Sequence, residues 1–132
     1  MIDLDRRSCL KGVDTIELDN ALGAQVAADH LRSLGHKRIA MISGPRHLSN
    51  SGNRLNGFRR ALREAGVQLP KEHVEFGDFR EESGRRAAEK ILSLEKRPTA
   101  LFVANNEMTA GALSALREQK MRIPDEISLV RI

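Results

Sequence analysis

The chain has 132 residues, of which 40% are hydrophobic and 30% charged, and this composition indicates one globular domain rather than a disordered or fibrous chain. No run approaches the roughly 18 consecutive apolar residues of a membrane span, and the opening residues, MIDLDRRSCLKG, lack the apolar stretch of a secretory signal. We therefore expect a cytoplasmic protein that contacts no membrane. The formal net charge is +4, which would suit binding to nucleic acid only if the basic residues clustered on one face.

Short apolar runs alternate with helical stripes along the chain, and this alternation is the strongest structural signal in the sequence. In chain order the pattern predicts a strand at TIEL (15–18), a helix at 20–35, a strand at RIAMIS (38–43), a helix at 51–66, a strand at HVEF (73–76), a helix at 81–94, a strand at TALFVA (99–104), a helix at 106–119 and a strand at ISLV (127–130). The first residues, MIDLD, fit a further strand whose place in a sheet is open. Asp19 or Asn20 can cap the first helix, and Gly35 can take the left-handed conformation that ends it.

Five strands that alternate with four helices predict a parallel sheet with right-handed crossovers. A strand that is apolar on both sides, such as TALFVA, must be buried on both sides, so helices have to cover both faces of the sheet. The apolar stripes expected to face the sheet are Leu55, Phe58, Leu62 and Ala65 in one helix and Ala87, Ile91 and Leu94 in another. The predicted fold class is therefore a three-layer α/β domain, with a parallel sheet between two layers of helices.

In an open parallel sheet, ligands bind beyond the carboxyl ends of the strands, where loops and helix N-termini converge. The strand ends here deliver the segments SGPRHLSNS (43–51), GDFREE (77–82) and NNE (105–107), and Arg131. They offer the ring of Phe79, the amides of Asn105 and Asn106, the hydroxyls of Ser43, Ser49 and Ser51, and one cation, Arg54, which we expect in the first turn of its helix. A flat apolar ring beside planar polar groups suits a sugar or a nucleoside.

Each of these residues also has a purely structural interpretation. Asn105 and Asn106 begin a helix, and capping alone explains one of them. Phe79 could fold back onto the core, and Arg54 could be a surface residue paired with an acid. A cation near a helix N-terminus opposes the helix dipole by about 0.3–1 kcal/mol, which gives a functional reason for Arg54 a little more weight.

The sequence contains none of the common motifs for catalysis or nucleotide binding: no G-x-S-x-G elbow, no Walker A loop, no G-x-G-x-x-G after the first strand and no H-E-x-x-H. Cys9 is the only cysteine, which excludes an intrachain disulfide and a cysteine-based zinc site. The histidines, which share no metal-ligand spacing, are His30, His36, His47 and His73. As a cation, His36 would favour the terminal carbonyls of the preceding helix. We expect no catalytic residue, metal or cofactor, and an enzyme is the weaker hypothesis.

The basic residues form no clear cluster in the sequence. Adjacent pairs occur at Arg6-Arg7, Lys37-Arg38, Arg59-Arg60, Arg85-Arg86 and Lys96-Arg97. Most of them have acids nearby, so solvated helix faces explain them. Trp and Tyr are absent and Phe occurs four times, so the aromatic platforms that stack single-stranded bases are missing.

Five blocks of the sequence occur in an order and at spacings that resemble one known family. They are LDNALGAQVAADHLRSLGHKRIAMISGP, RLNGFRRALREAG, GDF, PTALFVANNEMTAGALSALRE and IPDEISLV. Over nearly its whole length the chain resembles the effector-binding domain of the lactose repressor (LacI/GalR) family of bacterial transcription regulators. The resemblance implies a periplasmic-binding-protein-like fold, in which a small effector binds between two α/β lobes. Residues 1–19 would then be a remnant of the N-terminal lobe and residues 20–132 most of the C-terminal lobe, without the helix-turn-helix that reads operator DNA.

The resemblance also implies which residues bind the effector. Arg54 takes the position of an arginine that grips effector hydroxyls or carboxylates, and Phe79 the position of an aromatic residue that stacks on the effector. Asn105 corresponds to an asparagine that often bonds the effector. Asn50 falls where some family members use a hydroxyl side chain for the ligand.

Partners are implied in the same way. Such regulators pair through the C-terminal lobe, so the helix from 107 to 119, with Met108, Ala112 and Ala115, is a candidate contact surface for a homodimer. The alternative is that these residues only cover the sheet. Operator DNA would be bound only through a domain that this chain lacks.

Two departures from the family bear on the site. After ISLV the family usually continues with a glycine, an aromatic residue and an acidic pair, one acid of which commonly grips the effector, whereas this chain reads RI. Asn106 stands where an acid is familiar. Because the resemblance gives this chain only part of the two lobes between which the effector binds, we expect the chain alone to bind an effector weakly or not at all.

The expected function is that of the effector-binding and dimerisation region of a LacI-type DNA-binding regulator, which responds to a small sugar or nucleoside-like ligand. The alternative is a periplasmic-type solute-binding receptor for sugar transport, which has the same fold and the same stacking aromatic. The identity of the effector is open, because the family binds several classes of ligand on this scaffold.

Overall fold

The computed structural model describes residues 13–15 and 20–131 of the chain. Its elements are β1 (Val13–Thr15), α1 (Asn20–Ser33), β2 (Ile39–Ser43), α2 (Ser49–Glu64), the short 3-10 helix η1 (Lys71–His73), β3 (Val74–Phe76), α3 (Glu81–Leu92), β4 (Ala100–Val103), α4 (Asn106–Glu118) and β5 (Ser128–Arg131). The predicted strand at residues 1–5 and residues 16–18 of the strand at 15–18 lie outside the described residues. Each remaining predicted element is present, with its ends within two residues of those expected.

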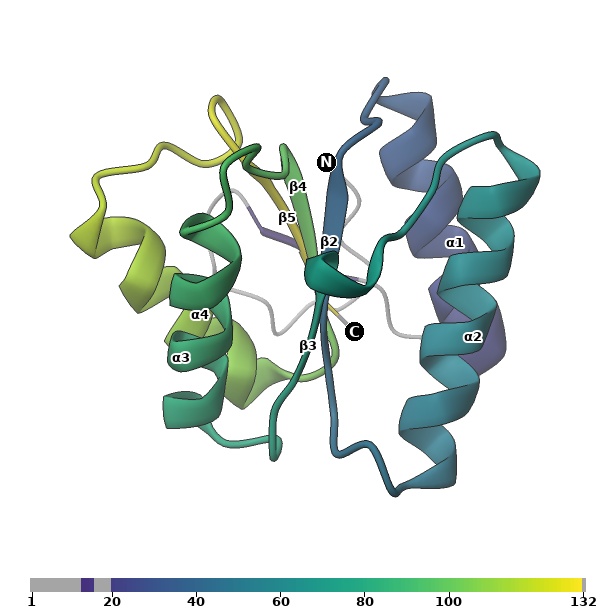
Figure 1. Cartoon of the computed structure of the whole chain (residues 1–132), viewed down its shortest axis with the longest axis horizontal. Coiled ribbons are helices and arrows are strands. Elements are labelled where there is room, and N and C mark those ends of the chain that lie inside the picture. Colours follow the sequence, from purple (N-terminus) through teal and green to yellow (C-terminus); the bar gives the residue numbers. More distant parts are fainter. Residues whose placement is uncertain (1–12, 16–19, 132) are drawn as a thin grey trace.

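The five strands form one parallel sheet in the order β1-β5-β4-β2-β3. In Figure 1 the strands run down the middle of the molecule, with α1 and α2 packed together on the right and α3 and α4 on the left. This arrangement confirms the three-layer α/β fold.

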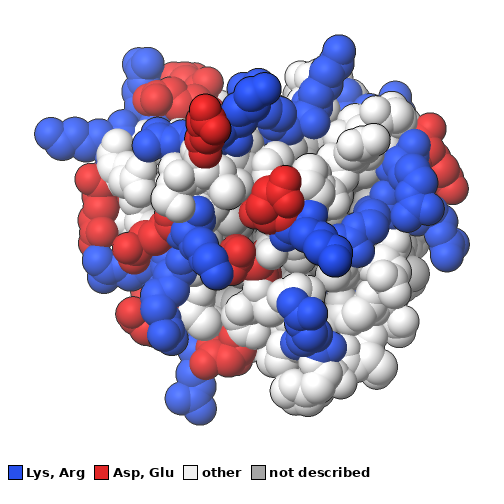
Figure 2. Space-filling view, in the orientation of Figure 1, with Lys and Arg blue, Asp and Glu red and all other residues white. Residues whose placement is uncertain are grey.

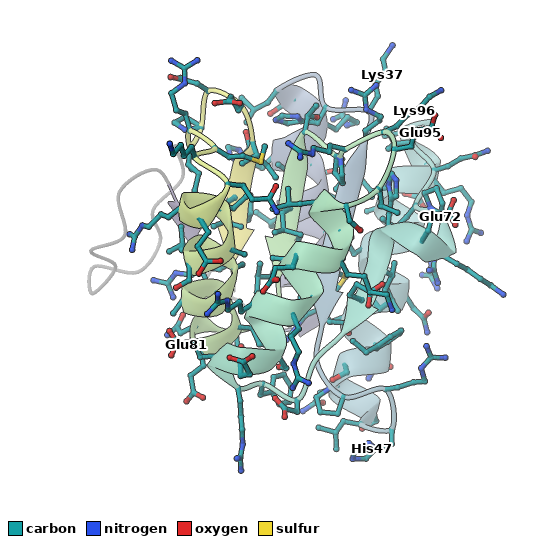
Figure 3. The ribbon with its side chains drawn as sticks, turned by 60° about the vertical axis from the view of Figure 1, so that its left-hand side comes forward. Lys37, His47, Glu72, Glu81, Glu95 and Lys96 are labelled. Carbon is teal, nitrogen blue, oxygen red and sulfur yellow. The ribbon has the colours of Figure 1, made fainter. Side chains whose placement is uncertain are left out.

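The two ends of the parallel strands form opposite edges of the sheet. Figure 3 shows Lys37 and Lys96, which precede β2 and β4, at the top, and His47 and Glu81, which follow β2 and β3, at the bottom. The lower edge is therefore the carboxyl edge, where the fold places a ligand site.

A hydrophobic cluster lies on each face of the sheet. Met41 and Phe102 point toward α1 and α2, and their neighbours Ile42 and Val103 point toward α3 and α4, because successive residues of a strand face opposite sides. The fully buried ring of Phe58, on α2, lies with its centroid 4.6 Å from that of Phe102. The strands are thus buried on both faces, as their apolar sequences predict.

The predicted apolar stripes of α2 and α3 are confirmed except at their last members. The stripe residues that are buried are Leu55, Phe58, Leu62, Ala87 and Ile91. Ala65 and Leu94 lie just beyond the ends of their helices and are only partly buried. Gly35 ends α1 with a φ of 85°, in the predicted left-handed conformation.

Helices α3 and α4 approach each other closely at a glycine. A Cβ atom on Gly111 would lie 2.6 Å from the backbone nitrogen of Arg85, which is far inside van der Waals contact. On α4, the side chains of Met108, Ala112 and Ala115 are fully buried. These three side chains therefore cover the sheet and α3, and the prediction that they form a contact surface for a second subunit is wrong.

Two predictions at helix ends are also wrong. Helix α2 begins at Ser49, after an N-cap residue, Leu48, that makes no side-chain capping bond. Arg54 is therefore the sixth residue of α2 rather than part of its first turn, so the argument from the helix dipole does not apply to it.

The ring of His36 does not bind the carbonyls at the end of α1. Its Nδ1 lies 2.8 Å from the hydroxyl of Thr99, and its Nε2 lies 3.0 Å from the hydroxyl of Ser128. Burial, and secondarily the charge of His30, lower the pKa of His36, so the fold favours the neutral ring. The residue links the starts of β2, β4 and β5 at the edge opposite the carboxyl edge.

Two wider expectations concern membranes and metals. Within residues 13–15 and 20–131, no helix combines the length and the apolar character that crossing a membrane requires. The same residues contain no group of three or more His, Cys, Asp or Glu side chains arranged to hold a metal ion.

Candidate functional site

The order of the strands places a switch point between β2 and β4. From β2 the chain passes through α2, on one face, to the edge strand β3, whereas from β4 it passes through α4, on the other face, to β5. The two helices thus leave neighbouring strands in opposite directions, and in open α/β sheets ligands bind at the carboxyl edge beside such a switch point. The segments that follow β2, β3 and β4 at this edge contain the predicted site residues.

Arg54 reaches from α2 to the end of β4. Its Nη1 donates a hydrogen bond of 2.9 Å to the carbonyl oxygen of Ala104, just beyond the end of β4. The side chain is half-buried, and burial lowers the pKa of the guanidinium. Because the ordinary pKa of arginine is far above neutrality, the group stays charged and can hold an anionic or hydroxyl-bearing ligand.

Asn105 is the N-cap residue of α4, as its structural interpretation predicts. Its Oδ1 accepts a hydrogen bond of 3.0 Å from the backbone N–H of Met108. Its Nδ2 donates one of 2.8 Å to the carbonyl oxygen of Phe79. One N–H and one lone pair of the carboxamide are thus used inside the protein, and only the second N–H and the second lone pair are left for a ligand.

Phe79 is held in an uncommon conformation by these contacts. Its φ of 71° lies in the left-handed region, which costs a residue other than glycine on the order of 1–3 kcal/mol. The hydrogen bond from Asn105 fixes its carbonyl, and its half-buried ring packs beside the hydrophobic cluster under α3 and α4. The ring also lies directly on Gly44, where a Cβ atom would collide with it. Phe79 therefore folds partly onto the core, while one part of the ring remains accessible.

Two serines at the same edge add polar groups. The Oγ atoms of Ser43, the last residue of β2, and Ser51, in the first turn of α2, are buried and have no hydrogen-bond partner among the described residues. Ser51 Oγ lies 2.7 Å from the position that a Cβ on Gly44 would take, so it adjoins the ring of Phe79. A buried hydroxyl without a partner costs about 1–3 kcal/mol, and a polar ligand at this edge would offset that cost.

The structure thus brings together three of the four predicted site residues. Arg54 binds the carbonyl of Ala104, the next residue is Asn105, and Asn105 binds Phe79. Asn50 is exposed at the second position of α2, one helical turn before Arg54, and no described contact joins it to the other three. The sequence offers Ser51 only as one of several hydroxyls, and it does not indicate that Gly44 supports the aromatic ring.

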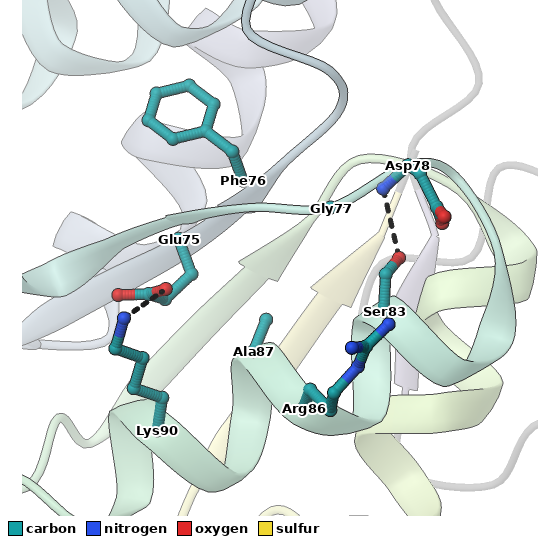
Figure 4. Close-up of a pocket in the computed structure, with 8 residues that line it drawn as sticks. All are labelled: Glu75, Phe76, Gly77, Asp78, Ser83, Arg86, Ala87 and Lys90. Atoms are coloured by element: carbon teal, nitrogen blue, oxygen red, sulfur yellow. Dashed lines mark hydrogen bonds and ion pairs between the residues drawn. The ribbon is translucent and has the colours of Figure 1, made fainter.

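A hollow of the described part of the molecule lies elsewhere, away from these residues. It measures about 540 Å³, lies between β3 and α3, and is lined by Glu75, Phe76, Gly77, Asp78, Ser83, Arg86, Ala87 and Lys90 (Figure 4). Glu75 and Lys90 form an ion pair of 3.6 Å, and the Ser83 hydroxyl accepts a hydrogen bond of 3.0 Å from the Asp78 backbone. Hydrogen bonds from Ser83 and from the Arg80 backbone lower the pKa of Asp78. Two acidic and two basic side chains line the hollow, and their charges balance one another. The hollow therefore has no net charge that would select a ligand.

Comparison with known proteins identifies the family. A family model described as the periplasmic binding protein-like domain matches residues 28–132. The chain is 40% identical over 114 residues to the HTH-type transcriptional repressor PurR of Klebsiella pneumoniae (strain 342), and the match covers 86% of this chain and 33% of the repressor. The chain therefore spans about a third of the length of this curated relative.

Solved structures are similar over most of the chain. A protein assigned as the transcriptional regulator LacI from Bacillus cereus subsp. cytotoxis NVH 391-98 has a TM-score of 0.83 and 38% sequence identity, and the match covers 97% of this chain and 44% of that one. A complex of the transcriptional regulator CelR with cellobiose has a TM-score of 0.81 and 35% identity, over 90% of this chain and 36% of that one. The chain belongs to the family of periplasmic binding protein-like domains and, within it, to the effector-binding domains of the LacI/GalR regulators.

Proposed function

We propose that this chain forms the C-terminal part of the effector-binding region of a LacI-type transcription regulator. The observation that carries the proposal is the linked set of Arg54, Asn105 and Phe79 at the switch point of the sheet. A cation, a carboxamide and an aromatic ring around one crevice suit a ligand with a flat apolar face and a polar rim, such as a sugar or a nucleoside. The similar regulator CelR has been solved with a disaccharide, cellobiose, which supports the sugar class.

Each residue has a distinct role in this proposal. Arg54 would donate hydrogen bonds to ligand hydroxyl or carboxylate oxygens from its guanidinium, which lies at the end of β4. Phe79 would offer the accessible part of its ring to the apolar face of the ligand. Asn105 would mainly position Phe79, and its second N–H would reach the ligand rim. Asn50, exposed at the mouth of the crevice, would add a further amide.

Regulation would come from the two-lobe arrangement of the family. In the proposed domain division, residues 1–19 belong to the N-terminal lobe and residues 20–132 to the C-terminal lobe, with the effector between them. An effector that favours one lobe arrangement by about 1–3 kcal/mol would shift the population of the regulator and its hold on DNA. Operator DNA would be bound by a separate helix-turn-helix domain, and the protein would work in the cytoplasm.

A homodimer is part of the proposal, and α4 remains its candidate surface. Because Met108 and its buried neighbours face inward, the contact would use the outer side of α4, where Ala110 and Ser114 are half-exposed and Arg117 is exposed. Sedimentation equilibrium should show a dimer that Ser114→Glu shifts toward monomer. A chain that stays monomeric at high concentration, or a dimer that the substitution leaves intact, would contradict this surface.

The known relatives favour a regulator over the other functions considered. The matched curated proteins are named as transcriptional repressors, and the matched structures as transcriptional regulators, rather than as transport receptors or enzymes. We therefore do not propose the solute-binding receptor.

The effector site is tested by ligand-observed NMR against a panel of pentoses, hexoses, disaccharides, purines and nucleosides. Because this chain supplies one wall of the site, we expect one class to bind with a Kd of about 1 mM or weaker. Arg54→Met and Phe79→Leu should abolish the signal, and Arg60→Gln, an exposed arginine on the same helix, should preserve it. Binding that survives both site substitutions would refute the proposed site, and a low-micromolar Kd would refute the one-wall account.

A further inference from the structure

A second hollow, which the proposed effector site does not use, lies between α2 and β3. It measures about 250 Å³ and is lined by Arg46, Leu55, Arg59, Lys71, Val74 and Phe76. We call it the basic hollow. A neighbouring hollow of about 330 Å³, lined by Arg59, Arg63, Val67, Gln68, Leu69 and Pro70, shares Arg59 with it. None of the residues that line either hollow is an acid.

The cations of the basic hollow come from three separate segments. Arg46 lies in the loop after β2, Arg59 in the third turn of α2, and Lys71 begins η1. Figure 2 shows Lys and Arg side chains across the right-hand half of the view, over the region of α2, η1 and β3. The scatter of basic residues along the sequence therefore hides a local cluster that only the fold assembles.

The alternation of β3 keeps its one carboxylate away from this cluster. Val74 and Phe76 face the basic hollow, whereas Glu75 faces α3 and forms its ion pair with Lys90. In the described structure no carboxylate lies within ion-pair distance of Arg46, Arg59 or Lys71, although other arginines and lysines of the chain are paired. Three like charges thus surround one concave surface, and their mutual repulsion falls when an anion binds there.

The hollow also has an apolar floor and one preorganised cation. Leu55 and Val74 are buried, and the half-buried ring of Phe76 lies beside them. The guanidinium carbon of Arg46 stands over this ring, 4.2 Å from its centroid, an arrangement that stabilises an exposed cation by about 0.5–1 kcal/mol. Guanidinium groups match the geometry of phosphate oxygens, and the apolar floor suits a ligand with a carbon skeleton.

We propose that the basic hollow binds a phosphorylated small molecule, with the phosphate held by Arg46, Arg59 and Lys71 and an apolar part of the ligand on Leu55 and Val74, beside the ring of Phe76 that Arg46 covers. The site is independent of the proposed effector site, because it uses none of the residues that surround Phe79. A regulator with both sites would respond to two kinds of small molecule.

The experiment is a titration of the protein with phenyl phosphate, monitored by isothermal calorimetry and by amide chemical shifts. We expect a Kd of about 1 mM or tighter, with affinity falling as salt rises. Inorganic phosphate should bind at least about fivefold more weakly, because it lacks the apolar part. Equal affinity for the two ions would overturn the role of the apolar floor, and no binding at about ten times the expected Kd would overturn the site.

Matched variants separate the basic hollow from non-specific attraction and from the effector site. Arg59→Gln and Lys71→Gln should each weaken phenyl phosphate binding by about fivefold or more. Arg60→Gln, which removes the same charge from an exposed position on α2 outside both hollows, should change it less than about twofold. Arg54→Met, which removes a residue of the proposed effector site, should leave the affinity for phenyl phosphate unchanged.

Two further outcomes would overturn the proposal. If Arg60→Gln weakens binding as much as Arg59→Gln does, the attraction depends only on net charge. If single-stranded oligonucleotides bind more tightly as their length grows and displace phenyl phosphate, the surface serves a nucleic acid rather than a small molecule.

Discussion

The close approach of α3 and α4 predicts a large cost for one added methyl group, Gly111→Ala. A Cβ at this position would overlap the carbonyl oxygen of Glu81 and lie 2.6 Å from the nitrogen of Arg85. Both are backbone atoms, so no side-chain rotation relieves the overlap. Relieving the Arg85 contact alone, from 2.6 Å to an ordinary 3.4 Å, requires the helices to separate by 0.8 Å, and relieving the tighter overlap with Glu81 requires more.

That separation sets the expected magnitude. A radial gap of about 0.5–1 Å forfeits a quarter to a half of the dispersion energy of the contacts it opens, and overpacking of this kind typically costs about 1–3 kcal/mol. Alanine has a higher helix propensity than glycine, which by itself stabilises the folded chain by roughly 1 kcal/mol. We therefore expect Gly111→Ala to lower the free energy of unfolding by about 2 kcal/mol net, with the overlap at the upper end of the overpacking range.

The control is Gly52→Ala, in α2, where nothing lies within 4 Å of the added Cβ. It should raise the free energy of unfolding by about 0.5–1 kcal/mol, because only helix propensity changes. Urea denaturation followed by circular dichroism measures both variants. If Gly111→Ala is as stable as the unaltered chain, or if the two alanines have the same effect, the reasoning from close helix packing is refuted.

Substitutions at three further residues test local features. Because the pKa of His36 is lowered in the folded chain, the unfolded chain binds more protons, and stability should fall as the pH drops below about 6.5. In the variant His36→Gln, the free energy of unfolding should depend less on pH below about 6.5, as measured by denaturation at a series of pH values. A variant whose stability falls with pH as steeply as that of the unaltered chain would contradict this role of His36. Asn105→Ala should lower the free energy of unfolding by about 1–3 kcal/mol, because both the helix cap and the hydrogen bond to Phe79 are lost. Asn105→Asp keeps a capping oxygen and should be the more stable of the two variants in thermal unfolding. Equal stability of the two variants would exclude the capping role. Gly35→Ala should lower the free energy of unfolding by about 1 kcal/mol, because alanine is strained at a positive φ. An unchanged midpoint of thermal unfolding would contradict this strain.

Much of the fold is predictable because its cause is local. The strands β2 and β4 are apolar at nearly every position, which only burial on both faces explains, and the helices carry apolar stripes at helical spacing. The start of α2 is less predictable, because Leu48 precedes it in place of a capping side chain. Likewise, the buried position of Met108 could not be told from sequence, since an apolar stripe looks the same whether it faces a sheet or a partner.

The candidate site is predictable in its position and not in its bonding. Parallel strands bring their carboxyl ends to one edge, so Arg54 and Asn105 could be placed there from the order of the elements alone. The bond from Asn105 to the carbonyl of Phe79 joins residues far apart in the chain and depends on a left-handed residue that the sequence does not mark. The basic hollow is hidden for the same reason, because Arg46 and Lys71 share no periodicity.

The central claim is that the crevice between the ends of β2 and β4 is the ligand site, and amide chemical-shift mapping during titration with the sugar or nucleoside that binds tests it most directly. The account predicts shifts concentrated at Gly44, Ser51, Phe79 and Asn105, which border that crevice. Shifts confined to the hollow between β3 and α3, around Glu75 and Lys90, would contradict it.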